Sequence, residues 1–186
     1  MDYSYREEHF IEEMLDGKVI YTPKPNTKHG EVGGNIICLF ANYLRGKKYR
    51  AFYWIEVYLD DYNTVVPDLC VICNPDIIKE QGIYGTPDLI IEIICPSTSK
   101  TDKTYKKNLY EKFGVKEYWI ISPRDCYAEV YHLIDEAYQL TEVYHRFEDY
   151  KTCFITQEEI NQIPRKIKVS IFDDLYIDVD DIFHNV

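Results

Sequence analysis

Two acidic residues interrupt strand-like runs of this sequence, and their types and spacing could support metal chemistry. Glu92 lies inside the apolar run Leu89 to Ile94, and Asp68 lies inside the run Thr64 to Cys73. If these runs are neighbouring strands, the alternation of side chains lets Asp68 and Glu92 converge. Two buried carboxylates that close together need a shared proton or a cation. Mg²⁺ in phosphate chemistry uses one or two carboxylates with water, and the backbone carbonyl of Ile93 is available as a further ligand.

A lysine on the segment that follows the second acid strengthens this interpretation. Residues from about 99 to 113 predict a helix by their apolar spacing. At about 100° per residue, one face of this helix carries Asp102 and Lys106 among the apolar residues Tyr105, Leu109 and Phe113. A lysine in the middle of a buried face should have a carboxylate partner. Asp102 at i,i+4 and Glu92 on the preceding strand are the two candidates.

These three groups also have plainer interpretations. Asp68 and Glu92 could each cap a loop or pair with a lysine, and Lys106 could pair with Asp102 while its ammonium stays in water. Taken together, however, two metal-binding carboxylates and an inward lysine are the minimal set for metal-dependent phosphodiester cleavage. The metal acidifies a bound water, and the lysine orients that water and stabilises the developing negative charge.

A strand–helix–strand unit must position these residues. Leu89 to Ile94 and Glu117 to Ser122 read as buried strands, and Gly114 ends the helix between them. The pattern predicts one α/β domain over residues 1–186 with a mixed sheet. The other predicted elements are a capped helical turn at 4–7, a hairpin of 10–14 and 18–21 around an Asp-Gly turn, a helix from 27 to 46, strands at 49–59 and 64–73, a loop at 74–85, a hairpin of 126–133 and 138–144, an edge strand at 166–171 and a terminal helix at 179–183.

Composition limits the class of protein. The apolar and charged fractions of 46% and 28% are typical of a globular protein. No run approaches the 18 or so apolar residues of a membrane span, and the first residues lack the regions of a signal peptide. We therefore expect a cytoplasmic protein without membrane contact. The net charge of −11, from 21 basic and 32 acidic residues, disfavours an extended nucleic-acid footprint but leaves room for a local basic patch or a dimer with a positive cleft.

The ordered motifs of the chain resemble those of a nuclease family. Asp on one strand and Glu-x-Lys on the next form the PD-(D/E)XK signature, and here Ile94 stands where that lysine is expected. Over residues 10–183 the chain resembles the Uma-type family of restriction endonuclease-like proteins, a branch of that superfamily. In that family the lysine is taken to come from the following helix, which matches Lys106. The matching motifs are Asp16-Gly17, His29, Val66-Pro67-Asp68-Leu69, Pro87 to Glu92, Pro96-Ser97-Thr98, Asp102-x-x-x-Lys106-x-x-x-Tyr110 and Gly114-Val115-x-Glu117-Tyr118-Trp119.

The resemblance implies a restriction-endonuclease-like fold, in which helices flank a central mixed β-sheet with an extra N-terminal hairpin and C-terminal strands. It also implies a DNA endonuclease that depends on Mg²⁺ or Mn²⁺. Asp68 and Glu92, with the Ile93 carbonyl, would hold the metal, and Lys106 would position the water. Some members of the superfamily act as dimers because each active site cuts one strand, and we expect a homodimer here.

Further residues are accessory candidates. His29 and Glu31 lie at the start of the first long helix, where an acid of this superfamily often adds to the metal site and where a cap is equally common. Asp102 is the third accessory candidate. The predicted contacts to the DNA backbone are the basic residues on the outer side of the helix, Lys100, Lys103 and Lys107.

Two other functions compete with this prediction. The first is a catalytically inactive module on the same fold that binds nucleic acid or protein, and the net charge of −11 favours it. The second is a hydrolase of some other phosphate ester. Metal binding separates the nuclease from the inactive module, and cleavage of DNA separates it from the other hydrolase.

Overall fold

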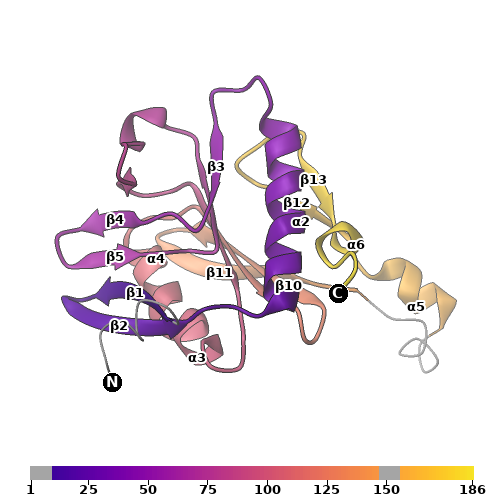
Figure 1. Cartoon of the computed structure of the whole chain (residues 1–186). Helices are drawn as coiled ribbons and strands as arrows, with labels where there is room; N and C mark the ends of the chain where they lie inside the picture. Colours follow the sequence, from indigo (N-terminus) through magenta and orange to yellow (C-terminus); the bar gives the residue numbers. More distant parts are fainter. Residues whose placement is uncertain (1–9, 147–155) are drawn as a thin grey trace.

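A six-stranded mixed sheet forms the centre of the computed structural model, which describes residues 10–146 and 156–186 (Figure 1). The strand order is β11-β10-β9-β8-β6-β3. β8 and β9 run parallel, and every other neighbouring pair in this sheet is antiparallel. The strands are β3 (Arg50–Tyr53), β6 (Leu69–Ile72), β8 (Leu89–Ile93), β9 (Glu117–Ser122), β10 (Tyr127–Ile134) and β11 (Ala137–His145). The predicted α/β class with a mixed sheet is confirmed.

A second sheet, of order β2-β1-β5-β4-β7, lies beside the first. The predicted N-terminal hairpin is confirmed, because β1 and β2 pair along their length and the turn residues Asp16 and Gly17 have φ of 48° and 72°. Positive φ at both central positions is what a type I′ turn requires. The strands are β1 (Phe10–Leu15), β2 (Lys18–Pro23), β4 (Val57–Asp60), β5 (Asn63–Val65) and β7 (Ile83–Tyr84). The strand β7 lies in the segment 74–85, for which the sequence predicts a loop.

The two continuous strands predicted at 49–59 and 64–73 are wrong, because each is divided between the two sheets. The first breaks at Trp54, which has a φ of 54° between β3 and β4. The second breaks at Pro67, whose nitrogen has no hydrogen for a sheet ladder. The two breaks are next to each other, since the backbone N–H of Trp54 donates to the carbonyl of Asp68. This corner places Asp68 directly before β6.

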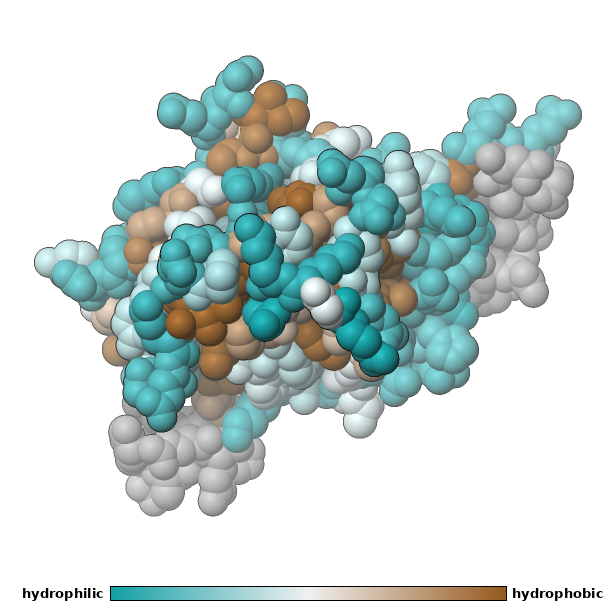
Figure 2. Space-filling view, turned by 90° about the horizontal axis from the view of Figure 1, so that it is seen from above, coloured by the Kyte–Doolittle hydropathy of each residue, from teal (hydrophilic) through white to brown (hydrophobic). Residues whose placement is uncertain are grey.

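The helices cover both faces of the six-stranded sheet. On one face, α2 (Thr27–Leu44) packs with α6 (Val179–Ile182) and with the small sheet of β12 (Lys166–Lys168) and β13 (Tyr176–Asp178). The opposite face packs against the second sheet and the helix before β9. In the view of Figure 2, hydrophobic residues form small groups among hydrophilic ones, as expected when the large apolar side chains lie between these layers.

The helix between β8 and β9 contains a π-helical turn. It consists of α3 (Ser99–Thr101), the π turn η2 (Asp102–Lys106) and α4 (Lys107–Lys112). A π turn inserts a residue and rotates the faces of a helix. Tyr105, which the regular projection placed on the apolar face, is therefore 37% exposed, whereas Asp102 and Lys106 are buried.

The C-terminal elements agree with the prediction in type more than in length. The edge strand predicted at 166–171 is shorter in the structure, where only β12 forms. The terminal helix predicted at 179–183 is α6. The remaining helical elements are the turn η1 (Pro75–Ile77) and α5 (Gln157–Gln162). The predicted capped turn at 4–7 lies outside the described residues. Within the described residues, no helix combines the length and apolarity needed to cross a membrane.

Candidate active site

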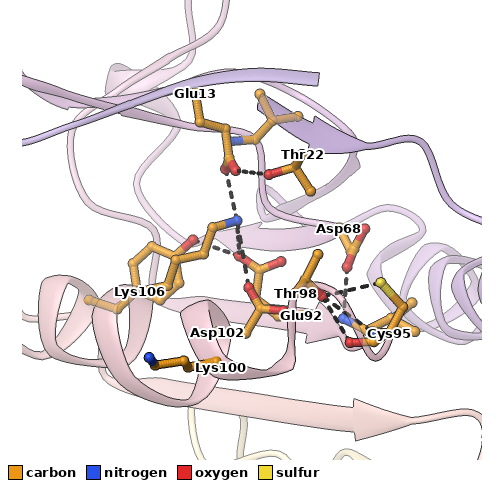
Figure 3. A network of polar contacts seen from close by, with 12 residues as sticks. Glu13, Thr22, Asp68, Glu92, Cys95, Thr98, Lys100, Asp102 and Lys106 are labelled. Carbon is orange, nitrogen blue, oxygen red and sulfur yellow. Dashed lines mark hydrogen bonds and ion pairs between the residues drawn. The ribbon is translucent and has the colours of Figure 1, made fainter. Parts of the chain in front are cut away.

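Lys106 lies in the interior among three carboxylates (Figure 3). Its Nζ is 2.8 Å from Oε1 of Glu13, 3.1 Å from Oε1 of Glu92 and 4.0 Å from Oδ1 of Asp102, and 5% of its side chain is exposed. The predicted inward direction of Lys106 is confirmed, and the alternative of an ammonium in water is wrong. Three separate elements, β1, β8 and the π turn, thus meet at one cation.

Asp68 lies directly before β6, the strand that neighbours the strand of Glu92. The antiparallel register of β6 and β8 ends with Leu69 opposite Ile91, so the residues that follow this last pair, Asp68 and Glu92, lie next to each other. Oδ2 of Asp68 accepts the backbone N–H of Ile93 at 2.7 Å. Asp68, Glu92 and Lys106 line one small cavity of about 40 Å³. The predicted convergence of the two carboxylates is confirmed.

Two further side chains fix the other oxygen of Asp68. Nε2 of His29 and Nε1 of Trp54 each lie 3.1 Å from Oδ1. His29 is buried in the first turn of α2, where Asn26 caps the helix by accepting the His29 backbone N–H. Trp54 reaches Asp68 because of its left-handed backbone at the corner between the sheets. The carboxylate is therefore held in one orientation by groups from three elements.

Glu92 is anchored through one oxygen only. Its Oε1 accepts the hydroxyl of Tyr110 at 2.7 Å as well as the ammonium of Lys106. Among the described residues, no donor contacts Oε2. Burial raises the pKa of Glu92 well above its ordinary value, although the attraction of Lys106 acts in the opposite direction. Ionised Glu92 is therefore poorly compensated by the protein alone.

The cavity carries an excess of acidic groups. Glu13, Asp68, Glu92 and Asp102 line it, together with His29 and a single lysine. Burial opposes the charge of that lysine, but its three carboxylate neighbours outweigh burial and raise its pKa. Burial also raises the pKa of Asp102 to about 6. A buried site of this composition favours either extra protons or an additional cation.

The raised pKa of Asp102 predicts a pH dependence of stability in EDTA. Because its folded pKa of about 6 exceeds the ordinary 3.8, the associated stability is present below about pH 4 and is lost as the pH rises through 6. Asp102→Asn lacks this titration. Its free energy of unfolding relative to wild type should therefore rise between pH 4 and pH 7 by on the order of 3 kcal/mol. Urea denaturation at several pH values measures this, with exposed Asp61→Asn as the matched control. A difference that stays flat with pH would contradict it.

The donor set of the cavity fits a hard divalent cation. The unbonded Oε2 of Glu92, the remaining lone-pair capacity of Asp68 and the carbonyl of Ile93 are all oxygen donors of the kind that Mg²⁺ and Mn²⁺ prefer. No group of three or more His, Cys, Asp and Glu side chains within 10–146 and 156–186 is arranged as a metal site. Such a set is not needed for Mg²⁺, which keeps several water ligands.

Comparison with known proteins assigns the chain to a family. Residues 3–157 match the model of Uma2, which is described as "Putative restriction endonuclease". The chain belongs to the Uma2 family. A relative of this Uma2 protein is the "Uncharacterized protein slr1290" of Synechocystis sp., which is 26% identical over 136 residues that cover 71% of this chain and 70% of the relative.

A solved structure shares the fold of this Uma2 protein. It is described as "a putative nuclease belonging to DUF820", from Anabaena variabilis. The TM-score is 0.70 at 24% sequence identity, and the alignment covers 92% of this chain and 89% of the other. The predicted restriction-endonuclease-like fold is thereby confirmed.

The accessory candidate Glu31 and the three lysines predicted to contact DNA do not line the cavity. Glu31 and Lys100 are exposed, and Lys100 points away from the cluster in Figure 3. Lys103 is engaged with β10, since its Nζ lies 2.5 Å from Oε1 of Glu129. Nζ of Lys107 lies 4.2 Å from the centre of the Tyr131 ring. This face of the helix is therefore partly occupied by intramolecular contacts.

Three residues of the Uma2 site were not predicted from the sequence, namely Glu13, Trp54 and Tyr110. Glu13 had a readable signal, because it alternates with Ile11 and Leu15 on the inner face of β1. An acid in the middle of an apolar strand face is the same pattern that identified Glu92. Trp54 has no such signal, because aromatic residues are ordinary in a core, whereas Tyr110 is marked in the sequence only by its place in the family motif.

Proposed function

We propose that this Uma2 protein is a divalent-metal-dependent DNA endonuclease. The observation that carries the proposal is the buried ammonium of Lys106, held between Glu13 and Glu92 in the cavity that Asp68 also lines. Membership of the Uma2 family, described as "Putative restriction endonuclease", supports a nuclease function. The acidic excess of the cavity supports a requirement for a cation.

The side chains divide into ligands and groups that hold them. Asp68, Glu92 and the Ile93 carbonyl would hold the metal, which when bound supplies an acidified water and neutralises charge on the phosphate. Lys106 orients the attacking water and stabilises the negative charge that develops on the phosphate. Glu13 fixes Lys106 in place. His29 and Trp54 restrict Asp68 in the same way, as does Tyr110 for Glu92.

The missing lysine two residues after Glu92 does not argue against catalysis. Ile94 at that position is 9% exposed and packs in the core on the face of the sheet that is covered by the second sheet and the helix before β9. The ammonium reaches Glu92 from the following π turn instead, at 3.1 Å. The chemical group is therefore present at the site although it comes from another element.

Metal-binding and cleavage assays test the proposal. We expect Mn²⁺ to bind in calorimetry, supercoiled plasmid to be nicked in Mg²⁺ or Mn²⁺, and EDTA to stop the reaction. The absence of both metal binding and nicking would favour the inactive binding module. Hydrolysis of bis-p-nitrophenyl phosphate without any cleavage of plasmid or of single-stranded DNA would favour a hydrolase of another phosphate ester.

A further inference from the structure

A larger groove opens between the β1–β2 hairpin and the helix that carries Lys106. It lies beside the small cavity that Asp68, Glu92 and Lys106 line, which we call the catalytic cavity after its proposed role. The volume of the groove is about 410 Å³, within the range of about 300–1,000 Å³ typical of ligand pockets. We call it the hairpin groove, and define it by Leu15, Ile20, Ser97, Thr101 and Tyr105. It is continuous with the catalytic cavity, because the two share Thr22, Pro23, Thr98 and Asp102.

The lining of the hairpin groove suits a flat ring with a polar edge. Leu15 and Ile20 contribute aliphatic surface, and the hydroxyls of Ser97 and Thr101 can bond to ring nitrogens and carbonyls. The hydroxyl of Tyr105 donates to Asp16 across the groove, so the tyrosine ring is held as a fixed wall. Aromatic walls of this kind stack nucleobases.

A third groove adjoins the same cavity, shares no lining residue with the hairpin groove, and is basic. It has a volume of about 310 Å³ and shares His29 and Cys95 with the cavity. Lys28 and Arg124 line it, and both are exposed. Neither forms an ion pair with an acid in the part of the chain that the structure describes, so both cations are available to phosphate.

Three different surfaces thus adjoin one another, because the small cavity shares lining residues with both grooves. The basic groove matches a sugar–phosphate backbone, the small cavity matches a single phosphate at its mouth, and the hairpin groove matches a base. A paired base inside a duplex cannot enter such a groove, because it would first have to leave the stack. A strand with unpaired nucleotides meets no such barrier.

We propose that the hairpin groove binds an unpaired nucleobase next to the phosphate that is cut, and that the substrate is single-stranded DNA. The inference rests on the proposed nuclease function. It also accounts for the net charge of −11, since a strand held by stacking and a few cations needs no extended basic face.

Fluorescence anisotropy in EDTA tests the inference without any cleavage. Fluorescein-labelled dT15 should bind at least about tenfold more tightly than a blunt duplex hairpin, because stacking contributes only to the single strand. Tyr105→Ala should weaken dT15 binding on the order of tenfold, and Tyr105→Phe should retain most of it. Tyr176→Ala, which removes an exposed tyrosine from β13, should have no effect.

A filling variant guards against misfolding of Tyr105→Ala. Ile20→Trp on β2 places a ring in the groove and should weaken dT15 binding while duplex binding stays constant. Equal affinity for duplex and single strand, or dT15 binding that neither variant changes, would overturn the inference. Failure of the two proposals is distinguishable, because tight dT15 binding in EDTA without cleavage of either dT15 or plasmid in Mg²⁺ or Mn²⁺ contradicts only the nuclease. Plasmid cleavage without a single-strand preference contradicts only the groove.

Discussion

Lys106→Met should lose plasmid cleavage by at least about 100-fold, the usual effect of removing one group that stabilises transition-state charge. It should also lower the free energy of unfolding at pH 7.5 in EDTA by about 3–5 kcal/mol, as expected when one partner of a buried ion pair is removed. Both effects have one cause, because this ammonium is the closest cation to Glu13 and Glu92. Plasmid nicking and guanidinium denaturation measure the two effects.

The pH dependence and two further variants make the Lys106 prediction specific. At pH 5 the stability loss should shrink, because the orphaned carboxylates can take up protons. Lys106→Arg keeps the charge and should largely restore stability, but the planar guanidinium should position water poorly. Lys112→Met, at the end of the same helix, should leave both measurements unchanged. Cleavage that persists in folded Lys106→Met would rule out the assigned role.

The central residues of the site could be predicted because each breaks a local pattern. Glu92 interrupts a core strand, and Lys106 interrupts the apolar face of a helix. Both residues were identified correctly as buried, although the strands at 49–59 and 64–73 and the regular helix were predicted incorrectly. The π turn moved Tyr105 to the surface but kept Asp102 and Lys106 buried, since these two were four residues apart on the inner side.

The rest of the site depends on contacts between distant segments. Glu13 reaches Lys106 only because β1 pairs with β5 and brings the hairpin over the helix. Trp54 contacts Asp68 because two strands break at one corner. Lys103 is engaged by Glu129 of β10, which local spacing cannot indicate. The sequence therefore predicts which residues break a local pattern. The pairing of distant segments decides which side chains form hydrogen bonds and ion pairs with them.

Glu92→Gln should have opposite effects on function and on stability. Mn²⁺ affinity should fall by more than about 100-fold, because loss of even an outer partner of a metal ligand costs about 10–100-fold. Plasmid cleavage should be lost with it. The free energy of unfolding in EDTA at pH 7.5 should instead rise, because burial raises the pKa of Glu92 and the amide resembles its neutral form. The Gln oxygen can still accept from Tyr110 and Lys106.

Asp88→Asn is the matched control for Glu92→Gln, since Asp88 directly precedes the same strand. Its carboxylate accepts the backbone N–H of Cys73 and pairs with Lys116, away from the catalytic cavity. Mn²⁺ affinity and cleavage should be unchanged in this variant. Titration calorimetry and denaturation on both variants measure the contrast. Equal Mn²⁺ affinity in wild type and Glu92→Gln would remove Glu92 from the metal site. A stability gain without loss of either metal binding or cleavage would show that the charge of Glu92 destabilises the fold and serves no catalytic purpose.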